Sequence, residues 1–153
     1  MRTPEERFWA KVDKTETCWN WTAALIRGYG QFTVRTKFQM RAHRYAYQAV
    51  HGAIDPALVI DHICRNRKCV RIDHLRLVTQ GQNTENQNGH RDGRSGHRGV
   101  TLHRSGRWRA YATKNGKMHS GGTYADVEDA AEAARQLRLR IHTHNELDRM
   151  VTK

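Results

Sequence analysis

Three cysteines and one histidine at a regular spacing constrain the fold of this chain more than any other feature. Cys69 follows Cys64 after four residues and His74 follows Cys69 after four more, whereas Cys18 lies far upstream. Three Cys and one His form a complete tetrahedral zinc site, and this set uses every cysteine of the chain. The pattern therefore predicts a small domain held by one structural zinc ion. The alternative is three unrelated buried thiols, which leaves the spacing of the histidine as a coincidence.

Length and charge limit the possible classes further. The chain has 153 residues, enough for one ordinary domain or two very small ones. The formal net charge is +12 and the isoelectric point is about 10.3. This charge indicates a polyanionic partner, most simply nucleic acid, although a solvated basic surface is the simpler alternative. An odd number of cysteines argues against a closed disulfide framework.

No membrane or secretory segment is expected. The sequence has no run of 18 apolar residues. The segment 1–10 is charged and lacks the apolar region of a signal peptide. We therefore expect a cytoplasmic protein without membrane partners.

A glycine-rich polar stretch divides the chain. Residues 89–96 contain three glycines and no apolar residue, which is typical of a linker. Residues 1–92 carry 15 basic and 9 acidic residues, and residues 93–153 carry 12 and 6, so both parts are equally positive. We expect one domain over 1–90, a linker over 91–96, a second domain over 97–145 and a tail over 146–153.

The first part shows alternating helix and strand signals. A capping Thr3, Pro4 and Glu6 precede a short apolar pattern and predict a first helix. Further on, the signals predict a turn and strand over 28–34, a helix over 42–50 that stops at Gly52, strands over 58–60 and 75–78, and a polar helix from Thr79 to about Asn88.

The second part predicts a meander followed by one helix. Strands are expected over 100–102, 108–113 and 118–124, with Ser105-Gly106 and Asn115-Gly116 at the turns. Asp126 is expected to cap a helix whose apolar residues follow helical spacing up to Ile141. No pattern is visible after His142. The predicted class is α+β, with a small three-stranded antiparallel sheet and one packed helix in the second part.

Three polar residues of the first part suggest phosphodiester chemistry. Asp61 and His62 end a short buried strand, and Asn83 lies on the polar helix nine residues after His74. A histidine can deprotonate water near neutral pH. Aspartate and asparagine oxygens suit Mg²⁺, which stabilises charge on a phosphate and its leaving oxygen. By itself an Asp-His pair is common and indicates little.

The motifs together resemble an HNH nuclease of the ββα-metal, or His-Me finger, fold. The resemblance rests on the segments 59–62, 64–69, 73–79 and 82–86, with upstream support from Trp19-Asn20-Trp21, Gly28-Tyr29-Gly30 and His43-Arg44. The His-x-Cys-x4-Cys-x4-His arrangement, with an asparagine nine residues later, is similar to that of His-Cys box homing endonucleases. The resemblance covers roughly residues 5–88.

The resemblance implies a role for each matching residue. His62 corresponds to the general base, and Asp61 and Asn83 to the ligands of a catalytic Mg²⁺ or similar cation. His74 stands both at the middle position of the HNH signature and at the last position of the zinc pattern, and we favour zinc. His43 and Arg44 stand where a basic side chain can touch the scissile phosphate, or they belong to an ordinary helix face.

The second part resembles the plant APETALA or ethylene-response-factor DNA-binding domain over about residues 95–142. The resemblance rests on 96–100, 106–110, 121–124 and 129–134. Strand alternation places Arg107, Arg109 and Tyr111 on the sheet face opposite the helix. Such a face can enter the major groove, and Arg98 and Arg107 are candidate phosphate contacts. Thr101, His103 and Thr113 stand where the plant domains usually carry Arg, so the sequence specificity of those domains is not inherited.

We therefore expect a homing-type, metal-dependent DNA endonuclease of bacteriophage or mobile-element origin. It would act on double-stranded DNA, carry one structural Zn²⁺ per chain and use Mg²⁺, either as a monomer or as a homodimer. Two alternatives stay open: a non-catalytic zinc-containing DNA-binding regulator, and a phage nuclease with little sequence preference.

Overall fold

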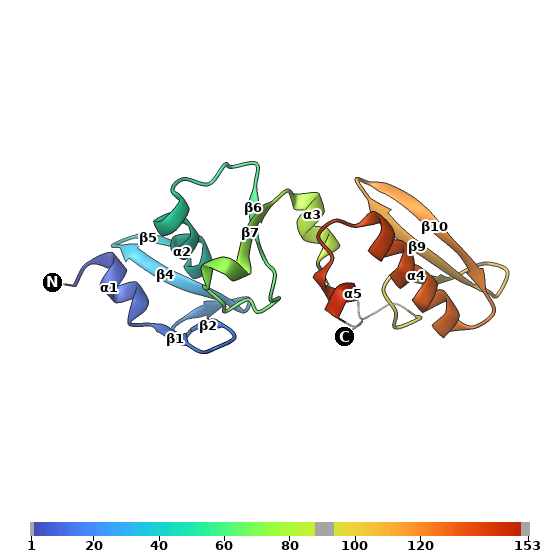
Figure 1. The fold of residues 1–153 in the computed structure, drawn as a ribbon, viewed down its shortest axis with the longest axis horizontal. Helices are drawn as coiled ribbons and strands as arrows, with labels where there is room; N and C mark the ends of the chain where they lie inside the picture. The colour runs from blue at the N-terminus through green and yellow to red at the C-terminus, as the bar shows by residue number, and fades with distance from the viewer. Residues whose placement is uncertain (1, 88–93, 151–153) are drawn as a thin grey trace. The chain divides into compact units, whose positions relative to one another are not determined.

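A computed structural model describes residues 2–87 and 94–150 and divides the chain into two compact units, Met1–Thr79 and Gln80–Lys153. Both units mix helices and strands, so the predicted α+β class is confirmed (Figure 1). Residues 91–93 of the predicted linker and Asn88, at the end of the predicted polar helix, lie outside the described residues, and the observed helix α3 (Gln80–Glu85) ends earlier than predicted. Among the residues described, no helix is long and apolar enough to cross a bilayer.

The first unit contains three small antiparallel sheets and two helices. Its elements are α1 (Pro4–Trp9), β1 (Val12–Lys14), β2 (Trp19–Trp21), β3 (Leu25–Ile26), β4 (Tyr29–Arg35), β5 (Phe38–Arg41), α2 (Ala42–His51), β6 (Val59–His62), the 3-10 turn η1 (Ile72–His74) and β7 (Leu75–Val78). The sheets are β1-β2, β3-β4-β5 and β6-β7. The predicted capping box on α1 is present, because the Thr3 hydroxyl accepts from the Glu6 backbone N–H and the Glu6 carboxylate accepts from the Thr3 N–H.

An aromatic cluster forms the core of this unit. Phe8 from α1, Trp21 from β2 and Phe32 from β4 are almost fully buried, and their rings lie 5.1–5.8 Å apart. Gly30 is required beside this cluster, since a Cβ there would lie 2.7 Å from the Trp21 ring. The core thereby fixes the start of β4, which carries Tyr29.

The second unit is a three-stranded sheet covered by one long helix. It contains α3 (Gln80–Glu85), β8 (Val100–Leu102), β9 (Trp108–Lys114), β10 (Lys117–Tyr124), α4 (Val127–Ile141) and α5 (Glu146–Met150), and the strand order is β10-β9-β8. As predicted, Asp126 caps α4 by accepting from the backbone N–H groups of Glu128 and Asp129. α4 crosses the sheet and buries Ala130 and Ala134 against Val100 and Ala110 (Figure 1).

The end of the chain differs from the sequence expectation. No pattern was expected after His142, but residues 146–150 form α5 and Asp148 is buried in an ion pair with Arg138 at 2.7 Å. Asn145 is fully buried and its side-chain amide donates to Asp148. Five residues are too few to show helical periodicity, so buried polar pairing, rather than an apolar pattern, orders this segment.

Candidate metal centre and active site

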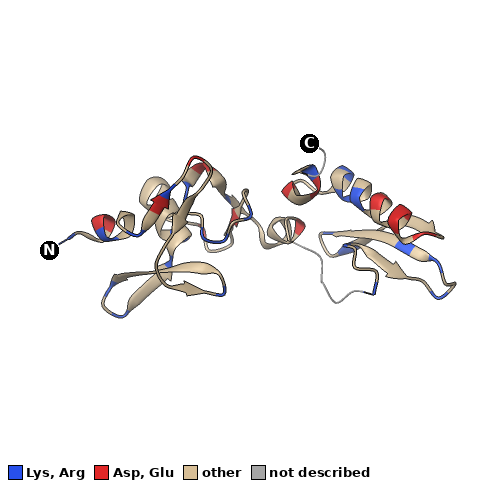
Figure 2. Cartoon of the chain, turned by 90° about the horizontal axis from the view of Figure 1, so that it is seen from below, with Lys and Arg blue, Asp and Glu red and all other residues tan. Residues whose placement is uncertain are grey.

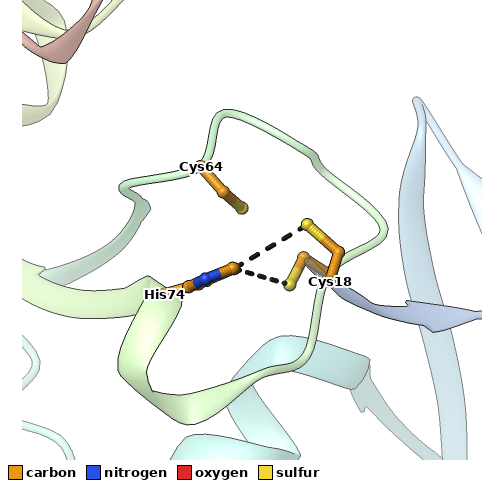
Figure 3. A group of neighbouring side chains, drawn as sticks. Cys18, Cys64 and His74 are labelled. Atoms are coloured by element: carbon orange, nitrogen blue, oxygen red, sulfur yellow. Dashed lines mark hydrogen bonds between the residues drawn. The ribbon is translucent and has the colours of Figure 1, made fainter. Parts of the chain in front are cut away.

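The four residues of the zinc pattern come together in the first unit. The ligand atoms of Cys18, Cys64, Cys69 and His74 all lie within 4.8 Å of one another. His74 Nδ1 lies 3.7 Å from Cys18 Sγ and 3.6 Å from Cys69 Sγ. Tetrahedral bonds of about 2.0–2.3 Å place neighbouring ligand atoms roughly 3.5–3.8 Å apart. The side chains point towards a common centre (Figure 3), so this group could hold a metal ion.

Backbone pairing between distant segments builds this group. Trp21 N donates to Lys68 O at 2.9 Å and Val70 N donates to Trp19 O at 2.8 Å, which sets β2 beside the segment 68–70. Cys18, just before β2, therefore meets Cys69. On the other side Ile63 N donates to His74 O at 2.9 Å, and this bond brings the residue after Ile63, Cys64, close to His74. The cluster thus joins Cys18 to the segment 64–74, which lies far from it in sequence.

Cys64 and Cys69 share a side-chain hydrogen bond. The hydrogen bond from Cys64 lowers the pKa of Cys69, and backbone N–H groups of Arg71 and Trp19 act in the same direction. The same bond, together with burial, raises the pKa of Cys64. A metal ion binds thiolates rather than thiols. Of the two thiols, Cys69 therefore loses its proton more readily, and a metal ion held by both sulfurs would require Cys64 to lose its proton as well.

The Asp-His pair lies at the end of β6, paired in register with β7. Asp61 faces Arg76 across the hairpin, and its Oδ2 accepts from Arg76 Nη2 at 2.8 Å and from Nε at 3.0 Å. Next to it, His62 is buried and its Nε2 donates to Cys69 O at 3.1 Å. A neutral imidazole that donates through Nε2 carries its lone pair on Nδ1. The position of His62 in the β6-β7 hairpin and its hydrogen bond to the Cys69 carbonyl thus fix both the orientation and the tautomer of the imidazole.

Burial keeps His62 and its neighbour His43 neutral. Burial lowers the pKa of His62, against an opposing effect of the Cys69 carbonyl. His43, on α2, lies with its ring 4.7 Å from that of His62, and burial together with the proximity of His62 lowers its pKa to about 3. His43 is therefore neutral near pH 7, and its contact with a phosphate stays a prediction. Arg44, the next residue, is half-buried on the same helix.

Two arginines that the sequence did not single out lie beside the histidine pair. The Tyr29 ring is 5.9 Å from that of His62 and 5.6 Å from that of His43. The guanidinium carbon of Arg41 lies 5.5 Å from the centre of the Tyr29 ring and that of Arg67 lies 5.3 Å from it. The positive charge of Arg67 also lowers the pKa of His62. Sequence spacing gave no signal for this arrangement, because Arg41 and Arg67 come together at the Tyr29 ring and at the neighbouring carbonyl groups of Ile26 and Arg27.

Asn83, the third predicted catalytic residue, lies half-buried on α3. Because α3 belongs to the second compact unit, the structure does not place Asn83 relative to Asp61 and His62. Their joint cation site stays a prediction.

The sheet of the second unit presents the predicted basic face. Ala110 and Ala112 are buried towards α4, so alternation directs Arg109 and Tyr111 to the other side. Arg107 is exposed, although its Nη2 donates to Thr123 O at 3.3 Å. No acidic residue lies on β8–β10, whereas α3, α4 and α5 carry the acidic residues of the unit's elements (Figure 2). Arg98 differs from the others, since its Nη2 donates to Glu85 O at 2.9 Å within the protein.

Comparison with known proteins agrees with both sequence resemblances. Residues 40–85 match the family model described as HNH endonuclease, and residues 95–144 match that described as AP2 domain. The chain combines an HNH-type segment with an AP2-type segment. It is also 37% identical over 71 residues to Protein 7.7 of Escherichia phage T7, a match that covers 46% of this chain and 54% of the relative. No solved structure matches the chain.

The two family matches indicate different roles for the two matched segments. The HNH-type segment includes the β6-β7 hairpin, His43, His62 and three of the four residues of the metal-binding group, whereas Cys18 lies outside it. An HNH match indicates a nuclease, and an AP2 match indicates DNA binding, so DNA is the indicated partner of both. The HNH-type segment ends at residue 85, inside the second compact unit.

Proposed function

We propose that this protein is a metal-dependent DNA endonuclease of the homing type. One observation carries the proposal: His62, in the HNH-type segment, is buried, neutral and held by the carbonyl of Cys69 at the end of a strand hairpin. A general base needs a fixed lone pair and a neutral resting state. The hydrogen bond on Nε2 supplies the first and burial supplies the second.

In the proposed reaction His62 Nδ1 accepts a proton from water while the water oxygen attacks the phosphorus. The bond from phosphorus to the 3′ oxygen breaks, leaving a 5′ phosphate and a 3′ hydroxyl after protonation of the leaving oxygen. Asp61 and Asn83 would hold a divalent cation such as Mg²⁺, which supplies stabilisation of charge on that oxygen. Arg41 and Arg67 would bind the phosphate backbone next to Tyr29, together with Arg44.

The cysteine group would hold one structural Zn²⁺. Its three thiols and one imidazole match the preferences of zinc, and its ligand separations are those of a tetrahedral site after small shifts. The second unit, which contains the AP2-type segment and is called the AP2-type unit below, would place the nuclease on double-stranded DNA through its basic sheet face. Association of two copies would allow cleavage of both strands.

Plasmid cleavage with Mg²⁺ tests the proposal. We expect discrete cleavage products from the wild type, and a loss on the order of 10²-fold or more in His62→Ala with DNA affinity nearly unchanged. His51→Ala is the matched control, because His51 is exposed at the end of α2 and should cut like the wild type. A wild-type protein that binds DNA without cutting would favour the non-catalytic regulator, and a smear would favour the nuclease of low specificity.

A further inference from the structure

We propose that Glu85 is a positioning residue that fastens helix α3, and with it Asn83, to the C-terminal segment 143–146. The AP2-type unit would then hold one of the cation ligands of the nuclease centre in place. This inference rests on the proposed function, because it assigns Asn83 to that centre.

The contacts of Glu85 carry the inference. Glu85 is 6% exposed. Its Oε2 accepts from Thr143 N at 2.8 Å, from His144 N at 2.9 Å and from the Thr143 hydroxyl at 3.3 Å. A carboxylate acceptor makes these hydrogen bonds charge-assisted, so they belong to the stronger class of hydrogen bonds.

Two neighbouring contacts complete the attachment. Asn86 Oδ1 accepts from Glu146 N at 3.1 Å, at the first residue of α5. Arg98 Nη2 donates to the Glu85 backbone oxygen at 2.9 Å. The end of α3 is thus held by the segment between α4 and α5 and by the segment that leads into β8.

Helix α3 has a low intrinsic stability. It is six residues long and contains no apolar side chain, only Gln80, Gly81, Gln82, Asn83, Thr84 and Glu85. Isolated helices shorter than about 12 residues are marginal in water, and glycine weakens them further. A carboxylate in the last turn is also unfavourable towards the helix dipole. Glu85 therefore does not serve the helix itself, and its partners in the C-terminal segment account for its place.

The consequence is a physical link between the two matched segments. By sequence α3 is the end of the HNH-type segment, and by contact it belongs to the unit that contains the AP2-type segment. Without the attachment, Asn83 would lie on a segment that spends much of its time unfolded. Only the folded fraction would be competent for cleavage, so turnover should fall while DNA binding persists.

The test compares Glu85→Ala, Glu85→Gln and the matched control Glu128→Ala in the full chain. Glu128 is an exposed acid on α4 of the same unit. We expect Glu85→Ala to lower kcat on the order of tenfold, with KM for DNA and metal content nearly unchanged. Glu85→Gln keeps an acceptor oxygen and should restore part of the activity. Glu128→Ala should behave like the wild type.

Hydrogen exchange supplies a readout that does not need activity. In Glu85→Ala the amides of residues 80–86 should exchange faster while those of α4 and β9 stay protected. If the wild type never cuts DNA, the proposed function fails, yet this exchange result still decides whether the attachment exists. Loss of protection in α4 would mean that Glu85→Ala unfolds the unit generally. In that case Asn86→Ala, which removes a second contact of the same attachment, replaces Glu85→Ala in the test. Unchanged or increased kcat with unchanged exchange at 80–86 would overturn the inference.

Discussion

Removing one residue of the cysteine group should unfold the first unit. We consider Cys64→Ser and His74→Ala, each of which leaves three ligands. The main core cluster of the unit contains four large, almost fully buried side chains, Phe8, Trp21, Phe32 and Val70. At about 1.5–3 kcal/mol each they contribute roughly 6–12 kcal/mol. Structural zinc in small domains contributes about 10–16 kcal/mol at pH 7, so the metal would be at least as important as the core.

Net stabilities of folded domains are only about 5–15 kcal/mol. The stabilising free energy lost with the zinc ion should therefore exceed the whole free energy of unfolding of this unit. Elemental analysis should find one zinc per wild-type chain and less in both variants. Tryptophan fluorescence reports unfolding of this unit, because Trp9, Trp19 and Trp21 lie there. The second unit should stay folded, since no ligand lies beyond His74.

His51→Ala is the matched control for His74→Ala, because it removes an exposed imidazole of the same unit. It should keep the zinc content and melting temperature of the wild type. A chelator should reproduce the effect of the ligand variants, and added Zn²⁺ should reverse it. If metal-free and zinc-loaded wild-type protein melt at the same temperature, zinc does not stabilise the first unit.

Further predictions concern catalysis and DNA binding. Asn83→Ala should reduce cleavage, and higher Mg²⁺ should partly restore it, because a ligand rather than the base is lost; rates over a Mg²⁺ titration check this. Since the pKa of His62 is lowered, its neutral form persists below the ordinary histidine range, and the acid limb of kcat/KM against pH should lie below about 6.5. Arg67→Ala removes a charge that lowers the pKa of His62, so the acid limb of kcat/KM against pH should move to higher pH. An acid limb that does not move would contradict this role of Arg67. Arg107→Ala should reduce the salt slope of DNA binding by about 0.9, whereas Arg140→Ala, on the helix behind the sheet, should not.

Local signals in the sequence were sufficient for most elements of both units. The Thr3 capping box, Gly52 and Asp126 mark helix ends through bonds to nearby backbone, and the structure has all three where expected. The spacing of Cys64, Cys69 and His74 predicted a group of side chains because loops of four residues keep them close. Cys18 was included only because three thiols and one imidazole complete a zinc site.

Features that depend on long-range contacts were missed. α5 is ordered by the buried ion pair of Arg138 and Asp148, and a periodic sequence pattern does not predict such a pair. Arg41 and Arg67 come together around the Tyr29 ring, through contacts far apart in sequence. The neutrality of His43 follows from burial and from its contact with His62, and the spacing of these residues in the sequence does not reveal that contact.

The geometry of Cys69 connects the metal-binding group to the candidate base. Its sulfur lies 3.6 Å from His74 Nδ1 in the metal-binding group, and its carbonyl oxygen lies 3.1 Å from His62 Nε2. Atoms of one residue thus contact both the group that would hold zinc and the candidate base. A metal ion that fixes the Cys69 side chain also restrains its carbonyl, and this carbonyl sets the tautomer of His62. Zinc loss should therefore impair the base even in molecules whose remaining core stays folded, because His62 would lose the bond that orients it.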